Sequence, residues 1–301
     1  MRNIEFKILN DSSYSDEISK ILNEEDMEAL IKIKYIKIPN LFDSLKLDGI
    51  GEVAIVIGID KRNNKLVGVG ACTVLAKNLA YLNSFRIKKE YRNKINFTLA
   101  YKSILNEMKN RGINRIITTI LEENKVAEKL LTKGKKNMPV YEFYKNINFH
   151  SIRNIKKGKL EIEDELTLLY KGLKIRIKKK TNKLYIAKDY KGIYGFLYKI
   201  RKILSYMGYP LLPTKNENFN FLYFAIEDKK LEYIESINAI KFLQNIGFNC
   251  DFFMIGVFED SALERYLKKV RSFKYKSKLY KVYYNIEDFS KEKIEFDFWD
   301  L

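Results

Sequence analysis

The fold of this chain is decided by the stretch from Asn83 to Asn124, which reads NSFRIKKEYRNKINFTLAYKSILNEMKNRGINRIITTILEEN. Residues 82–87 have the composition of a short strand, and a charged loop follows at residues 88–94. Apolar residues then recur every three or four positions and predict a helix with one apolar face: Phe97, Ala100, Tyr101, Ile104, Leu105 and Met108. Gly112 suits the end of that helix, and the β-branched residues 113–121 predict a buried strand.

The loop before the predicted helix carries Arg92 and Lys94. The first N–H groups of a helix lack partners within the helix, and the helix dipole makes that end positive. A basic loop at such an end can hold a phosphate or a pyrophosphate. The plainer interpretation is an ordinary strand-to-helix connection with solvated charges.

Length and composition limit the class of protein. A chain of 301 residues suggests two domains, and 46% hydrophobic residues are ample for packed cores. There is no uncharged apolar run of about 18 residues and no signal-peptide core at the N-terminus, so we expect a cytoplasmic protein without a membrane span. Cys72 and Cys250 are far apart in apolar contexts, which favours two buried thiols over a disulfide.

The formal net charge of +18 invites a polyanionic partner such as nucleic acid, an anionic membrane or a phosphorylated ligand. A competing explanation is compositional, because the chain is rich in Lys, Ile, Asn and Tyr together, as an AT-rich genome would produce. The basic residues are dispersed, apart from residues 176–180 and 268–281.

Several kinds of catalytic site are excluded. The single histidine, His150, sits in an apolar run, and there is no G-x-S-x-G, no P-loop and no dinucleotide-binding glycine motif. One histidine and two scattered cysteines cannot supply a zinc site, so we expect no metal. His150 is best interpreted as structural.

The rest of the first half can be assigned in order. Strands are predicted at residues 4–9, 52–60, 66–75, 78–87 and 141–153, and a short helix at 125–131. Asp11 or Ser12 is expected to cap a helix that includes Ile18 and Ile21. Residues 26–35 could be helical, with Pro39 ending the helix.

This order resembles the GNAT (Gcn5-related N-acetyltransferase) fold over roughly residues 1–155. Residues 60–70, DKRNNKLVGVG, resemble the family's second and third strands. Residues 91–97, YRNKINF, fall where the family has its R-x-x-G-x-G/A pyrophosphate loop, and residues 123–127, ENKVA, resemble its N-x-x-A motif.

The resemblance implies acetyl-CoA as co-substrate. The residues it would place at the cofactor are Phe85, Arg86 and Ile87 along the pantetheine arm, the loop residues Arg92, Asn93, Lys94, Ile95, Asn96 and Phe97, and Asn124. Ile95 and Phe97 stand where the family has glycines, which let the backbone approach the pyrophosphate closely. This departure implies weakened or absent cofactor binding.

The resemblance also implies catalytic residues. Tyr144 falls at the family's general-acid tyrosine position, and Tyr141 is a second candidate. In a chain with 21 tyrosines, both are also consistent with ordinary strand or core aromatics. The general base would be a carboxylate such as Glu123 or Glu52, or a water.

The second half repeats the pattern. Strands are predicted at residues 220–226, 250–258 and 275–284, and helices after Ser236 and at residues 261–270. The helix-ending glycines Gly112 and Gly247 lie 135 residues apart, which resembles a tandem GNAT protein. We therefore predict an α+β fold of two GNAT-like domains, residues 1–157 and 158–301, each a mostly antiparallel twisted sheet flanked by helices.

The second domain is expected to bind no cofactor, because Glu227 and Asp228 place negative charge where a pyrophosphate would lie. Its expected role is to bind the acceptor or to be structural. Three functions follow from the sequence: transfer of an acetyl or other acyl group from acyl-CoA to a small-molecule or protein amine, a Fem-like transferase that uses aminoacyl-tRNA, or a non-catalytic binding protein on a GNAT scaffold.

Overall fold

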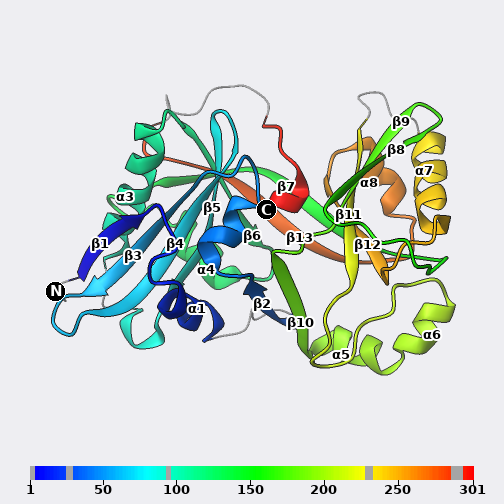
Figure 1. Cartoon of the computed structure of the whole chain (residues 1–301), viewed down its shortest axis with the longest axis horizontal. Coiled ribbons are helices and arrows are strands. Elements are labelled where there is room, and N and C mark those ends of the chain that lie inside the picture. The colour runs from blue at the N-terminus through cyan, green and yellow to red at the C-terminus, as the bar shows by residue number, and fades with distance from the viewer. Residues whose placement is uncertain (1–3, 25–29, 93–95, 228–232, 286–293) are drawn as a thin grey trace.

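The computed structural model describes residues 4–24, 30–92, 96–227, 233–285 and 294–301. The predicted cofactor-loop residues Asn93, Lys94 and Ile95 lie outside these ranges, as does Asp228. The molecule has two halves that lie side by side and meet at long central strands (Figure 1).

The first half contains β1 (Ile4–Leu9), α1 (Ser15–Asn23), β2 (Ile31–Lys37), α2 (Leu41–Lys46), β3 (Val53–Asp60), β4 (Lys65–Ala76), β5 (Leu79–Ile87), the 3-10 turn η1 (Lys89–Tyr91), α3 (Phe97–Asn110), β6 (Arg115–Leu121), α4 (Lys125–Thr132) and β7 (Val140–Arg153). The second half contains β8 (Glu165–Tyr170), β9 (Leu173–Lys178), β10 (Lys183–Tyr190), α5 (Gly192–Lys199), α6 (Arg201–Tyr206), β11 (Phe221–Glu227), α7 (Tyr233–Asn245), β12 (Phe252–Phe258), α8 (Ala262–Leu267), β13 (Ser272–Tyr283) and the 3-10 turn η3 (Phe298–Asp300).

Eleven of the strands form one continuous sheet in the order β1-β3-β4-β5-β6-β13-β7-β12-β11-β9-β8. The last strand of the second half, β13, lies between β6 and β7 and is antiparallel to both. In turn β7, the last strand of the first half, pairs with β12. The predicted fold class is confirmed, but the two halves exchange their final strands, which the sequence did not predict. The predicted boundary at residues 157 and 158 falls between β7 and β8 and remains a prediction.

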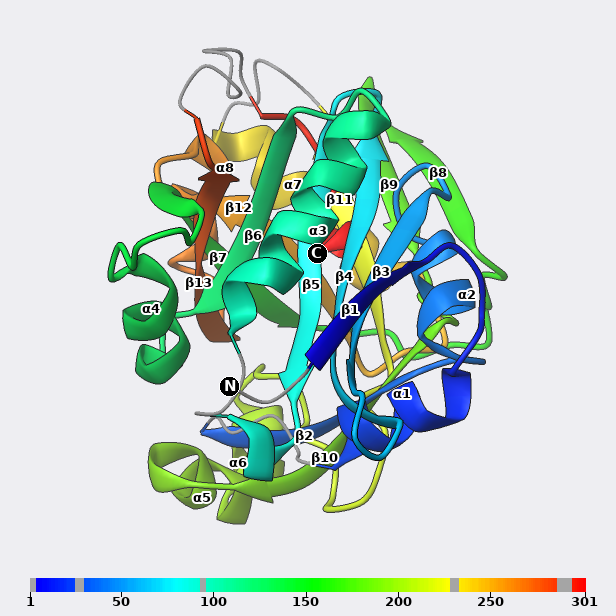
Figure 2. The ribbon, with the colours of Figure 1, turned by 90° about the vertical axis from the view of Figure 1, so that its left-hand side faces the viewer.

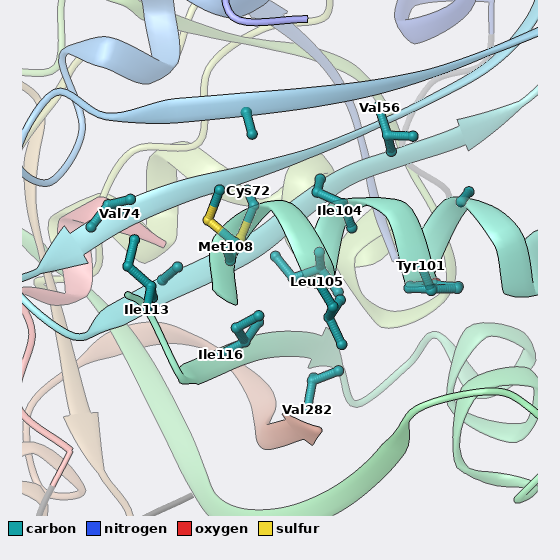
Figure 3. Packing of buried hydrophobic residues seen from close by; sticks show 14 of the residues in the cluster. Val56, Cys72, Val74, Tyr101, Ile104, Leu105, Met108, Ile113, Ile116 and Val282 are labelled. Carbon is teal, nitrogen blue, oxygen red and sulfur yellow. The ribbon is translucent and has the colours of Figure 1, made fainter. Parts of the chain in front are cut away.

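The helix predicted after the basic loop is confirmed as α3. Its apolar face covers the first half of the sheet (Figures 2 and 3), and Ile104 and Met108 are fully buried there. Full burial of such a side chain stabilises the fold by about 1.5–3 kcal/mol. Gly112 follows the helix with φ +77°, the left-handed conformation expected of a glycine beyond a helix end.

Three local predictions are wrong. The described part of residues 26–35 is not helical, because Ile31–Lys37 forms β2, which pairs with β10 in a separate two-stranded sheet. The residue before α1 is Tyr14, in a left-handed conformation without a capping hydrogen bond; the Asp11 carboxylate instead accepts from the Ser13 N–H at 2.9 Å. Ser236 lies inside α7, which begins at Tyr233.

The single histidine is buried in the seam between the halves. His150 of β7 lies 2.7 Å (Nε2 to Oε2) from Glu264 of α8, and its Nδ1 lies 3.2 Å from the Ser272 hydroxyl of β13. The other Glu264 oxygen accepts from the Asn148 amide at 2.8 Å. Burial lowers the pKa of His150, although the Glu264 carboxylate opposes this. Its place in the seam agrees with a structural histidine. Among the described helices, none has the length and apolar character needed to cross a membrane.

Candidate functional site

The predicted cofactor strand contains a bulge where it separates from its neighbour. β5 and β6 pair in parallel over three residue pairs, from Leu79–Arg115 to Tyr81–Ile117. On the other side, Ala71 of β4 lies opposite Asn83, whereas Val69 lies opposite Arg86, so β5 has one extra residue. Ser84, with φ +58°, occupies this bulge. Past the third pair, β5 has no ladder to β6. The Leu82 carbonyl still accepts from the Thr118 hydroxyl of β6 at 2.8 Å, and beyond this contact a gap lies between the two strands.

The Phe85 side chain holds the bulge in place. Its ring stacks on Tyr101 of α3, with centroids 4.6 Å apart and the planes 10° from parallel. The ring also lies against Gly70, because a Cβ atom at that position would come within 2.6 Å of it. Gly70 therefore has a packing role, and a larger residue there would displace Phe85 and with it the bulged backbone.

The basic loop is anchored by a group of residues that the sequence analysis missed. The buried Tyr91 hydroxyl donates to Asp60 Oδ2 at 3.2 Å, and the Arg62 guanidinium donates to both oxygens of the same carboxylate at 3.0 and 2.6 Å. Hydrogen bonds from Arg62 hold the pKa of Asp60 well below its usual range. The sequence signal was an Asp-x-Arg pair at the hairpin turn after β3.

The described residues on either side of positions 93–95 have features that suit an anion. Arg92 Nε donates to the Ile87 carbonyl at 3.3 Å, which ties the loop to the end of β5. The Asn96 side chain caps α3 by accepting from the Thr98 N–H at 3.1 Å. The first turn of α3 contains no acidic residue, so the helix has no carboxylate of its own to oppose the positive end of its dipole. Phe97 is the first residue of α3.

A cavity of about 490 Å³ lies between the two halves. Ser84, Phe85 and Arg86 of β5 line it, as do residues 121–124 at the end of β6, so the gap between these strands opens into it. Other parts of the cavity wall are formed by residues of β2, β10, β11, β12 and β13. Its volume is in the range of small-molecule sites, and most of its wall is apolar or aromatic, as in such sites.

Of the predicted catalytic residues, Glu123 lines this cavity, and its Oε2 accepts from the Leu30 N–H at 3.1 Å. Tyr141 is buried on the α3 side of the sheet, with its ring 6.3 Å from that of Tyr101, and burial raises its pKa. Tyr144 packs edge-on against Phe258 in another cluster. Neither tyrosine is part of the described cavity wall, and Glu52 is exposed outside it.

The cavity contains six tyrosines that the sequence analysis did not select: Tyr35, Tyr81, Tyr185, Tyr194, Tyr223 and Tyr275. The Tyr81 hydroxyl lies 2.7 Å from the Thr119 hydroxyl, across the point where β5 and β6 separate. Burial raises the pKa of Tyr81, so its phenol is protonated at neutral pH. In the sequence, Tyr81 is recognisable only as an aromatic residue of the predicted strand, two positions before Asn83. Nothing nearby distinguishes it from the other aromatic residues in strands.

The two basic stretches are extensively ion-paired. Arg176 contacts Glu165, Glu227 and Asp297, and Lys180 contacts Asp48 and Asp300. In β13, the partners of Lys276, Lys278 and Lys281 are Glu259, Glu128 and Glu142. These stretches therefore present less free positive charge than the sequence suggests. In the described ranges, no group of three or more His, Cys, Asp or Glu side chains is placed to hold a metal ion.

Asn124, predicted to contact cofactor or backbone, accepts from the Ala127 N–H at 3.1 Å and caps α4. We expect Asn124→Ala to lower the free energy of unfolding by about 0.5–2 kcal/mol, the usual cost of losing such a cap. Asn124→Asp should retain most of this stability, because aspartate is an equally good cap. Urea denaturation of the three proteins tests this, and equal losses in both variants would contradict the capping role.

Residues 20–134 match the family model described as acetyltransferase (GNAT) family. No curated protein matches the chain. Among solved structures, a tandem GNAT protein from the clavulanic acid biosynthesis pathway is similar over 94% of this chain and 99% of its own, with 7% identity and a TM-score of 0.50. An acetyltransferase from Streptococcus agalactiae covers 54% of this chain and 91% of its own, with 16% identity and a TM-score of 0.34. An acetyltransferase of the GNAT family from Staphylococcus aureus covers 50% and 86%, with 15% identity and a TM-score of 0.34.

The matched segment contains the bulged β5 and the parallel β6, so the GNAT family match covers the candidate site in the first half. The likeness over nearly the whole length concerns the fold, and it extends to the second half. The chain has the fold of a tandem GNAT protein, and Ile95 and Phe97 stand where the resemblance of the sequence places glycines.

Proposed function

We propose that this protein transfers an acetyl or other acyl group from acyl-CoA directly to an amine. The observation that carries the proposal is the bulge at Ser84, where β5 leaves β6 and both strands line the central cavity. A thioester placed along this gap would meet backbone groups on one side and an enclosed space for an acceptor on the other. Direct transfer needs alignment of the two reactants and no covalent nucleophile.

The described residues near the gap suit acyl-CoA. Backbone groups of Phe85, Arg86 and Ile87 would hold the pantetheine arm and polarise the thioester carbonyl. Arg92 and the positive end of α3 would hold the pyrophosphate. The co-substrate would supply the activated acyl group, and side chains of the protein would accept the proton of the amine and donate one to the leaving thiolate.

Glu123 is our proposed general base, because its carboxylate lies in the cavity wall. For protonation of the leaving thiolate we retain Tyr141 and Tyr144 as the proposed residues. Tyr141 is the better placed of the two, since its ring contacts Tyr101, which stacks on Phe85 at the bulge. Its raised pKa keeps the phenol protonated, as a proton donor requires.

The second half, residues 158–301, is proposed to close the acceptor site without binding a cofactor of its own. Tyr185, Tyr223 and Tyr275 bring aromatic surface from three of its strands to the cavity. Glu227, the last residue of β11, forms ion pairs with Lys174 and Arg176, so its charge is compensated within the second half.

Calorimetric titration with acetyl-CoA tests the proposed function. We expect micromolar binding to the wild type, weakened at least about 10-fold in Arg92→Ala through loss of a charge-assisted contact worth roughly 1.5–3 kcal/mol. Arg265→Ala, which removes an exposed guanidinium on α8, is the charge-matched control and should bind like the wild type.

Two outcomes would count against the proposal. Equal weakening in Arg92→Ala and Arg265→Ala would indicate attraction by net charge alone and not a pyrophosphate site. No binding to the folded wild type would mean that the residues replacing the glycines close the site, and the non-catalytic scaffold would then be the better hypothesis.

A further inference from the structure

The small β2–β10 sheet places like side chains opposite one another. In its register Tyr35 lies opposite Tyr185, and Lys37 lies opposite Lys183. All four side chains line the central cavity, so they share the face of this sheet that points inward. The sheet lies between the two halves in Figure 1. Like charges directly opposite each other destabilise a sheet, and enclosure makes the repulsion stronger.

The carboxylates around these lysines are already engaged. Asp48 is 1% exposed and pairs through one oxygen with Lys180 at 2.7 Å and through the other with Lys183 at 2.9 Å. Asp300 also pairs with Lys180, at 2.8 Å. The two carboxylates thus pair with Lys180 and Lys183, and within the described part of the chain Lys37 is the one of the three lysines without an ion pair.

Lys37 has an aromatic surface as its neighbour instead of a carboxylate. Its ammonium lies 5.1 Å from the centre of the Tyr35 ring, which in turn stacks on Tyr185 at 5.0 Å. Burial, followed by the charge of Lys183, lowers the pKa of Lys37 well below its usual range, and the opposing charge of Asp48 does not restore it. A buried ammonium group without a paired carboxylate is stabilised when a bound anion forms an ion pair with it.

We propose that the cavity binds an amphipathic organic anion, with an apolar or aromatic body against the tyrosines and one carboxylate- or phosphate-type group paired with Lys37. This inference rests on the proposed function in one respect, since it makes that molecule the acceptor. The acceptor would then be an amine that carries an anionic group at its far end.

The walls of the cavity suit the two ends of such a molecule. Lys37 is on β2, whereas Glu123 follows β6 and lines the same cavity as the bulge residue Ser84, and a carboxylate there suits the reacting amine. The aromatic surface of the same cavity includes the pair Tyr185 and Tyr223, whose hydroxyls lie 3.3 Å apart. Burial raises the pKa of both phenols, so they remain neutral and do not repel an anion.

The test uses three probes with the same carbon skeleton: 4-phenylbutyrate, the neutral 4-phenylbutanamide and the cationic 4-phenylbutylamine. Calorimetry on the full chain without acyl-CoA should find the carboxylate at least about 10-fold tighter than the amide, which is about 1.4 kcal/mol. In Lys37→Gln the ratio of the affinities for the carboxylate and the amide should fall to near one, and in Lys37→Arg the preference for the carboxylate should persist. Lys188→Gln, on β10 outside the described cavity wall, is the control and should keep the wild-type preference.

A stability measurement separates binding from a structural role. Because Lys37 lacks a counter-ion, Lys37→Met should raise the melting temperature by a few degrees while abolishing the carboxylate-induced stabilisation. Equal affinities for the three probes in the wild type, or an unchanged preference in Lys37→Gln, would overturn the inference. These outcomes are independent of acetyl-CoA: failure of the proposed function would leave the carboxylate preference intact, and failure of the inference would leave acetyl-CoA binding intact.

Discussion

Replacing Leu279 by alanine is expected to destabilise both halves of the molecule together, by about 2–5 kcal/mol. Leu279 is fully buried in β13, the exchanged strand, and packs in one cluster with Ile117 of β6 and Ile147 of β7. Removing its side chain leaves a cavity in the only part of the described sheet where the strands of the two halves alternate. Chemical denaturation should therefore show one cooperative transition at a lower midpoint.

Hydrogen exchange measured by mass spectrometry identifies which half responds. Amides in α3 and in α7 should lose protection by similar amounts, although the two helices are in different halves. Leu169→Ala provides the control, since Leu169 is 77% exposed on β8 and should change stability by less than about 0.5 kcal/mol. Loss of protection in α3 alone would show that the halves unfold independently.

Asp48→Asn is expected to have an effect of similar size, about 3–5 kcal/mol, because it removes the carboxylate shared by two buried lysines. Burial raises the pKa of Asp48, but the charges of Lys183 and Lys180 outweigh it and the pKa is lowered overall. A lowered folded-state pKa stabilises the fold above the unfolded pKa of about 3.9 and ceases to do so as the pH falls through the folded value. The difference between wild type and variant should therefore persist from pH 7 to about pH 5 and shrink in stronger acid.

Two further variants of the chain serve as controls for this experiment. Asp251→Asn removes a carboxylate paired with Lys157 at the surface and should cost only about 0–1 kcal/mol. Combining Asp48→Asn with Lys183→Met should recover part of the lost stability, because one of the uncompensated cations is then removed. A double variant less stable than Asp48→Asn alone would contradict this account of the ion cluster.

The sequence predicted β5, α3 and β6 well because their signals are local. The apolar period of α3, the positive-φ glycine after it and the β-branched run of β6 all lie within one stretch. β2 was mistaken for part of a helix although residues 31–35, IKIKY, alternate apolar and basic residues, a period-two signal. The alternation was present in the sequence and was overlooked.

The exchange of β7 and β13 and the central cavity had no comparable signal. Both strands alternate and are apolar on their inward positions, so either could pair with β6, and only packing across the whole sheet decides between them. Likewise Lys37, Asp48, Lys183 and Asp300 come from four separate segments. Their assembly into one ion cluster depends on tertiary contacts that no single stretch encodes.

The exchanged strand also sets an order of events during biosynthesis. The first half has all its strands except the one beside β6 once residue 153 has been made, but β13 is completed only at residue 283. Until then β6 lacks its native partner on one side, and its open edge can pair with β7 or with another chain. A ribosome therefore has to translate well over one hundred further residues before the first half can close, which makes the nascent chain of this protein a natural client for chaperones.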